Sequence, residues 1–213
     1  MAANSDRLRG NNLYYGILRE LMRFSNVQSI LPLQHKMNAV LVYYERLKNL
    51  HACKTNPNFW LQYAIARLAL GAYEDARIKL STAYAHAHAR PSYNTFMLDN
   101  TAARLELEQL IAVPTADNTQ AIASFRKARA ILNGQVSKRE YRDYPFRVAT
   151  KYEPFLAAHR SVLLTEGREE IARAGRFILR RIDGLSTYRS NHRNVVECRK
   201  AMERILSEAA LTD

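Results

Sequence analysis

Hydrophobic residues recur at spacings of three and four along nearly the whole chain, and no segment alternates convincingly enough to predict a strand. Proline, glycine and asparagine divide this pattern into about nine predicted helices. The predicted ranges are 11–24, a helix that starts at 29–32 and reaches 47, 57–71, 73–88, 93–111, 119–132, 138–164, 166–182 and 191–210. We expect Pro145 and Pro154 to break or kink the helix over 138–164, and Asn133-Gly134 to end the helix over 119–132. The sequence therefore predicts an all-α protein.

Short turns join the predicted helices, so we expect consecutive helices to pack as antiparallel neighbours. Such pairs predict one continuous helix-pair superhelix, a solenoid with an extended surface. The expected array has three parts. They are an N-terminal helical pair (1–55), a repeat-like region (56–134) and a basic C-terminal helical region (135–213).

One predicted helix pair has the spacing of a repeat. A large residue stands early in its first helix, Gly71 permits a tight turn, and small residues let the second helix approach closely. The positions that carry the pattern are Trp60, Gly71, Tyr73, Ala76, Leu80 and Ala83, with a second copy at Ala121, Phe125, Ala128 and Leu132. This pattern resembles the tetratricopeptide repeat (TPR), although Ala64 stands where glycine is usual. The resemblance implies a TPR-like solenoid that binds peptides or other proteins.

The segment 56–109 carries a second likeness. The residues concerned are FWLQYA at 59–64, Ala83-Tyr84, TFMLDN at 95–100 and Ala103-Arg104. They are similar to the helical C-terminal region of large prokaryotic antiviral proteins, which join repeats of this kind to a nuclease, SIR2 or STAND-type NTPase module. The resemblance implies the sensing or scaffolding part of a bacterial antiphage defence complex. It also implies a protein partner, an effector with NTPase, NADase or nuclease activity.

Positive charge is concentrated in the C-terminal half. The chain has a formal net charge of +12, and 19 basic against 9 acidic residues lie between Arg126 and Arg204. On the predicted helix over 166–182, Arg173, Arg176 and Arg180 share one stripe, which Glu169 and Asp183 flank. A basic half attracts polyanions, so nucleic acid or an acidic protein surface is a natural partner. The alternative is a solvated helix face on which arginines maintain solubility.

The residues that catalysis or metal binding requires do not occur at recognised spacings. The chain has no GxxxxGK[ST], GxGxxG, HExxH or GxSxG motif, and two cysteines cannot form a disulfide framework. His86 and His88 point to different sides of a helix, so they do not share a metal-binding face. We therefore expect no enzyme activity, no cofactor and no metal. The absence of an apolar run of membrane-spanning length favours a soluble, cytoplasmic protein.

Two further groups of side chains are candidates for interaction. Asn100 shares a predicted buried face, and Gln62 or Tyr84 are the expected partners of its amide. An interhelical hydrogen bond that sets the helix register is favoured over a ligand contact there. The second group interleaves cations with aromatic residues, as base stacking or a protein groove requires, although amphipathic packing is the favoured explanation. Its members are Tyr141, Arg142, Tyr144, Phe146, Arg147, Lys151 and Tyr152.

These observations favour a non-enzymatic module for protein–protein interaction or assembly, and they are compatible with self-association. The alternative is a nucleic-acid-binding subunit that uses the basic C-terminal half. The two hypotheses differ in their salt dependence, because contacts to phosphates weaken steeply as salt rises.

Overall fold

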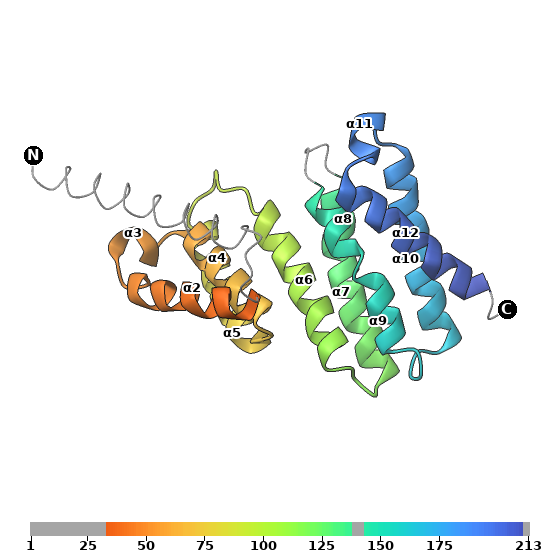
Figure 1. The fold of residues 1–213 in the computed structure, drawn as a ribbon, viewed down its shortest axis with the longest axis horizontal. Helices are drawn as coiled ribbons and strands as arrows, with labels where there is room; N and C mark the ends of the chain where they lie inside the picture. Colours follow the sequence, from red (N-terminus) through yellow and green to blue (C-terminus); the bar gives the residue numbers. More distant parts are fainter. Residues whose placement is uncertain (1–32, 138–142, 211–213) are drawn as a thin grey trace, which may run out of the picture. The chain divides into compact units, whose positions relative to one another are not determined.

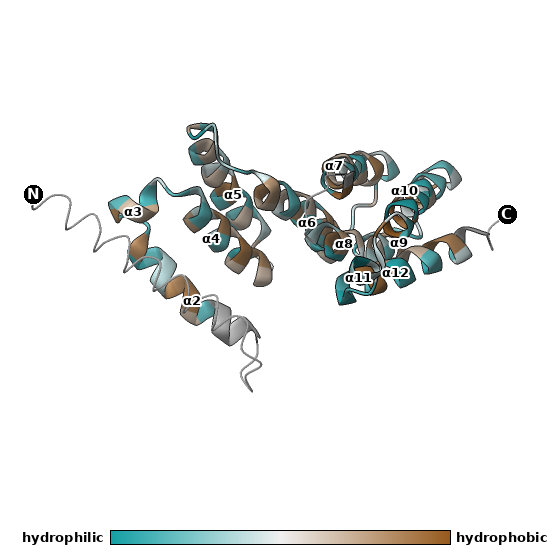
Figure 2. Cartoon of the chain, turned by 90° about the horizontal axis from the view of Figure 1, so that it is seen from above, coloured by the Kyte–Doolittle hydropathy of each residue, from teal (hydrophilic) through white to brown (hydrophobic). Residues whose placement is uncertain are grey.

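The computed structural model describes residues 33–137 and 143–210, and every regular element in these ranges is an α-helix (Figure 1). The helices are α2 (Leu33–Leu47), α3 (His51–Lys54), α4 (Pro57–Ala69), α5 (Tyr73–His88), α6 (Phe96–Ala112), α7 (Asn118–Ser137), α8 (Tyr144–Ala149), α9 (Tyr152–Ala158), α10 (Thr165–Asp183), α11 (Thr187–Ser190) and α12 (Arg193–Ala210). The chain divides into two compact units, Met1–Leu98 and Asp99–Asp213, called here the N-terminal and C-terminal units. No helix in the described ranges is both long and apolar enough to cross a bilayer. Hydrophobic and hydrophilic residues instead alternate around the helices (Figure 2).

The helices over 57–71 and 73–88 are confirmed as α4 and α5. The side chain of Asn56 caps α4 by accepting a hydrogen bond of 2.9 Å from the Asn58 backbone N–H. Gly71 ends this helix in the left-handed region, with a φ of +72°. The predicted helix over 11–24 lies outside the described residues.

The prediction that Asn133-Gly134 ends a helix is wrong. Helix α7 continues through Gly134 to Ser137, and Gly71 is the only described residue with a positive φ. Beyond the glycine, the buried Gln135 donates a hydrogen bond of 2.9 Å from Nε2 to Asp99 Oδ2 of α6. Val136 packs against the core of the C-terminal unit. Tertiary contacts therefore outweigh the weak helix propensity of glycine, which is about 1 kcal/mol.

Proline divides the segment 138–164 as expected. Pro145 lies in the first turn of α8 and Pro154 in the first turn of α9, where a missing N–H costs no helical hydrogen bond. The short helices α3 and α11 were not predicted, since four residues are too few to show a period. The expected three-part division and the continuous array remain predictions.

Aromatic rings form the core of the N-terminal unit. Tyr44 of α2 lies edge-on to Phe59, with ring centroids 5.2 Å apart, and stacks on Tyr63 at 5.0 Å. In α5, Ala76 and Ala83 are buried, so the helix approaches α4 closely. The two helices joined at Gly71 are thus a tightly packed antiparallel pair.

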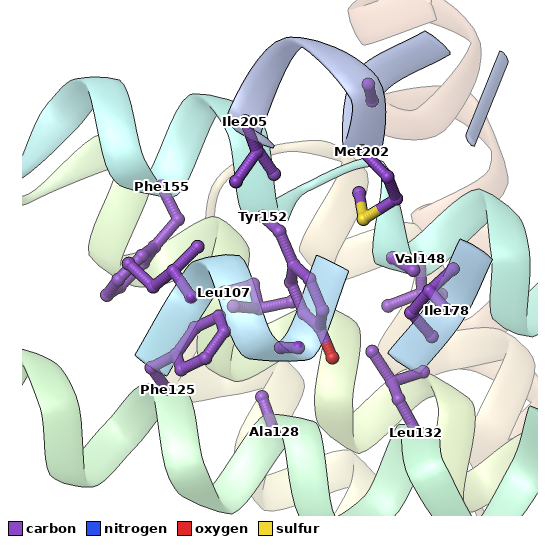
Figure 3. Close-up of a cluster of buried hydrophobic side chains, with 14 of the residues drawn as sticks. Leu107, Phe125, Ala128, Leu132, Val148, Tyr152, Phe155, Ile178, Met202 and Ile205 are labelled. Atoms are coloured by element: carbon purple, nitrogen blue, oxygen red, sulfur yellow. The ribbon is translucent and has the colours of Figure 1, made fainter. Parts of the chain in front are cut away.

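Helices α7 to α10 and α12 surround the core of the C-terminal unit, together with the part of α6 that includes Leu107 (Figure 3). Tyr152 of α9 lies near the middle of this cluster, with its ring centroid 4.8 Å from that of Phe125 on α7. Helix α10 packs against α7 on one side and α12 on the other. Ile171, Ile178 and Ile182 of α10 are buried, which fixes the opposite face of the helix toward solvent.

Candidate functional site

Ion pairs engage nine of the arginine and lysine side chains in the described part of the C-terminal unit, so positive charge remains available only at some positions. The pairs are Arg104–Glu108, Lys151–Glu108, Arg126–Glu170, Arg129–Glu170, Lys127–Glu106, Arg160–Glu208, Arg193–Glu197, Arg199–Asp183 and Arg204–Glu153. Their members come from α6, α7, α9, α10 and α12, with Lys151 and Arg160 on the connecting segments. Basic side chains outside these pairs are therefore the ones available to bind an anion.

Three such cations lie on one face of α10. Arg173, Arg176 and Arg180, called here the arginine row, are all exposed. None of the three forms an ion pair with a residue in the described ranges. At the rise of an α-helix, the row extends about 10.5 Å. The stripe predicted from sequence is therefore a line of exposed guanidinium groups.

The arginine row borders a shallow hollow in the surface. The hollow has a volume of about 440 Å³ and is lined by the row and by Leu179. Leu179 is half-buried, one turn from Arg176. Cationic groups thus lie beside an apolar group, and the surface matches a ligand that is both anionic and partly apolar.

Two arginines of α7 bind the carboxylate of Glu170. Glu170 is buried, and its oxygens accept hydrogen bonds of 2.6–3.0 Å from Arg126 and of 2.9 Å from Arg129. These hydrogen bonds, above all those of Arg126, lower the pKa of Glu170 against the opposing effect of burial. The field of Arg173 lowers it further. This cluster fixes α10 against α7.

Of the two acids that flank the row in sequence, one forms an ion pair and the other does not. Asp183 accepts a hydrogen bond of 2.6 Å from Arg199 of α12, so its charge is already engaged. Glu169 is exposed, one turn before Arg173, and forms no ion pair within the described part of the chain. Glu169 is therefore the acid whose charge most directly opposes binding of an anion to the row.

The described members of the second candidate group lie in different surroundings. Tyr141 and Arg142 lie outside the described residues. Tyr144 is half-buried against the core of the C-terminal unit, and Lys151 Nζ lies 3.0 Å from Glu108 Oε1. Arg147 is exposed on α8. The two remaining aromatic members of the group, Phe146 and Tyr152, are buried in the core.

Asn100 is fully buried in α6, within the C-terminal unit. Its expected partners Gln62 and Tyr84 are half-buried in the N-terminal unit, and their pairing with Asn100 remains a prediction. The buried amide of Gln135 binds Asp99. The sequence did not indicate this contact, because Gln135 lies beyond the predicted end of the helix over 119–132.

Neither cysteine is positioned for nucleophilic chemistry. Burial raises the pKa of the Cys53 thiol to about 11 and that of Cys198 to about 12. Both thiols are therefore protonated at neutral pH, and a thiol is a poor nucleophile compared with a thiolate. Within the described ranges, no three histidine, cysteine or acidic side chains gather as metal ligands.

Comparison with protein-family models, with curated proteins and with solved structures finds no match to this chain. In the described ranges the protein is all-helical, and adjacent helices pack as pairs.

Proposed function

We propose that this chain is a non-enzymatic interaction module that binds an acidic segment of a partner protein through the arginine row. The observation that supports the proposal is the contrast within the C-terminal unit. Nine other arginines and lysines in the described part of the unit are engaged in ion pairs, whereas Arg173, Arg176 and Arg180 remain exposed beside a hollow. An unneutralised row of this kind attracts and orients an anionic surface.

The helix pairs support a scaffolding role. Helices α4 and α5 pack across the turn at Gly71, with Ala76 and Ala83 at the buried seam. The corresponding side chains of the second repeat copy are also buried, namely Ala121, Phe125, Ala128 and Leu132. These contacts are those that a TPR-like solenoid requires, and we propose that architecture for the chain.

The resemblance of the segment 56–109 to prokaryotic antiviral proteins supports a more specific setting. We propose that the chain is the sensing or scaffolding part of a cytoplasmic antiphage defence complex. The partner would then be an effector with NTPase, NADase or nuclease activity, and it would carry the acidic segment.

Nucleic acid is the second candidate partner, because guanidinium groups bind phosphate as well as carboxylate. The row itself favours this candidate. The apolar Leu179 in the same hollow favours a protein, since the phosphates that guanidinium groups bind offer no apolar surface to cover it. Burial of Phe146 and Tyr152 also removes two aromatic rings from any base-stacking surface.

The test is mass spectrometry of the intact complex from the native cell at moderate salt, before and after nuclease. The variant R173Q/R176Q/R180Q is compared with R160Q/R193Q/K200Q, which removes the same charge from exposed positions outside the row. We expect a protein partner that survives nuclease, is lost in the row variant and is retained in the control variant. Loss of every partner after nuclease would instead establish the nucleic-acid function.

A further inference from the structure

We infer that the ligand of the arginine row is an acidic amphipathic helix, which lies along α10 and places an apolar side chain on Leu179. This inference rests on the proposed function and specifies the chemistry of the partner. Three features of the surface support it: rigidity, spacing and the position of Leu179.

The row is held on a rigid support. The face of α10 opposite the row is buried through Ile171, Ile178 and Ile182. The bidentate contact of Arg126 with Glu170 joins the same helix to α7. The Cα positions of the three arginines are thus fixed before a ligand arrives, which lowers the entropic cost of binding.

The spacing of the row matches the spacing of charges on a helix. Successive arginines are three and four residues apart, which corresponds to rises of about 4.5 and 6.0 Å. Carboxylates three and four residues apart on a second helix repeat with the same rises. In an extended strand, side chains on one face recur every two residues, about 6.8 Å apart, so three of them extend further than the row. A helical ligand therefore aligns all three ion pairs at once.

Leu179 lies at one flank of the row. It follows Arg176 by three residues and lines the same hollow. A ligand that covers it needs an apolar stripe directly beside its acidic stripe, as an amphipathic helix has. Burial of the exposed part of Leu179 would add an apolar contribution that does not depend on salt.

Labelled peptides and the full-length chain test this inference by fluorescence anisotropy. The first peptide is an amphipathic helix of about 20 residues, since shorter isolated helices are marginal in water. Its glutamates follow the three-and-four spacing, with leucines on the adjacent stripe. The second peptide has the same composition in scrambled order, and the third carries alanine in place of each leucine. A single-stranded oligonucleotide of equal charge is the fourth probe.

We expect the amphipathic peptide to bind most tightly. R173Q/R176Q/R180Q should weaken this binding about tenfold, as the loss of three exposed charge pairs predicts. The matched variant R160Q/R193Q/K200Q should remain within about twofold of the wild type, because surface pairs outside the site contribute little. The substitution Leu179→Ala should weaken binding of the leucine peptide and leave that of the alanine peptide unchanged.

The alternative outcomes separate this inference from the proposed function. Equal binding of the scrambled peptide would overturn the helical ligand and leave the acidic partner in place. Insensitivity of the leucine peptide to Leu179→Ala would overturn the apolar contact. Binding of the oligonucleotide without binding of any peptide would overturn both proposals. Failure of every probe would overturn this inference alone, since the native complex tests the proposed function independently.

Discussion

Glu170 shows how one residue determines the charge of a surface. Its buried carboxylate binds Arg126, which is 65% exposed, and Arg129, which is 33% exposed. This single carboxylate engages two cations of α7 and offsets one of their two positive charges, while the arginine row on α10 forms no ion pair in the described ranges. Single side chains also determine the stability of the core.

Replacing Glu170 with glutamine is expected to destabilise the protein by about 1–2 kcal/mol at neutral pH, since the buried carboxylate loses its charge-assisted hydrogen bonds to two arginines that are themselves partly exposed. The pKa of Glu170 is lowered in the folded state, so its stabilising effect is present above the unfolded pKa of about 4.3. The effect disappears as the pH falls through the folded pKa. Urea denaturation of the wild type and of E170Q between pH 7 and pH 3 measures the difference. A difference that grows on acidification would contradict the role assigned to the carboxylate.

Replacing Tyr152 with phenylalanine is expected to leave stability unchanged or to raise it by up to about 1 kcal/mol. The Tyr152 hydroxyl is buried, and no described residue forms a hydrogen bond with it. Removing the group therefore removes an unsatisfied polar atom while keeping the ring that packs on Phe125. The control is Tyr152→Ala, which should cost about 3–5 kcal/mol through loss of the ring. Thermal unfolding of both variants provides the measurement, and a large loss in Y152F would show that the hydroxyl has a partner such as a bound water.

At the scale of the helix, local propensity competes with tertiary contact. Two glycines within helices illustrate this, one kept there against its propensity and one required there by packing. Gly134 lies within α7 although its propensity favours a helix end, because Gln135 and Val136 bind the rest of the unit. Gly167 lies within α10, and there the lack of a side chain is required by a neighbouring helix. A Cβ at Gly167 would lie 2.9 Å from Ile122 Cδ1 and 3.1 Å from Leu163 Cδ2.

The two glycines should therefore respond oppositely to alanine. G134A is expected to stabilise the protein by about 0.5–1 kcal/mol, since no atom lies within 4 Å of the added Cβ and alanine is the better helix former. G167A gains the same propensity, but overpacking costs about 1–3 kcal/mol, so a net loss is expected. Chemical denaturation of both variants compares them directly. A G167A protein as stable as G134A would mean that Ile122 and Leu163 move aside freely.

At the scale of the whole molecule, the net charge of +12 conceals a local pattern. Long-range attraction depends on all exposed charges, whereas recognition depends on the few that no carboxylate neutralises. The arginine row is the part of the C-terminal unit in which three such charges align. A prediction about salt separates the local contribution from the general one.

Binding of the acidic amphipathic peptide to the wild type is expected to weaken as salt is raised, because the row is exposed to screening. R173Q/R176Q/R180Q should show a much shallower dependence, and R160Q/R193Q/K200Q should follow the wild type. Both variants have the same formal charge and differ in where charge is removed, although the control also releases Glu208 and Glu197 from ion pairs with Arg160 and Arg193. Anisotropy titrations at several salt concentrations provide the slopes. Equal flattening in both variants would indicate a general field rather than a site.

Much of the fold was predictable because its determinants are local. The apolar period, together with Pro57, Gly71 and Pro145, predicted where most helices begin and end. The end of α7 was not predictable in this way, since the contacts that extend it come from α6 and the core. Likewise, the sequence placed three arginines on one stripe but did not indicate which basic residues of the unit would form ion pairs and which would not.

The sequence by itself determined the helical class, the stripe on α10 and the excess of positive charge. Only the tertiary structure decided where that charge remains available. Arg126 and Glu170 are 44 residues apart in the chain, and Asp183 and Arg199 are 16 apart, yet both pairs form hydrogen bonds. Helix formation depends on neighbours within one or two turns, whereas neutralisation of a charge depends on whichever helix packs beside it.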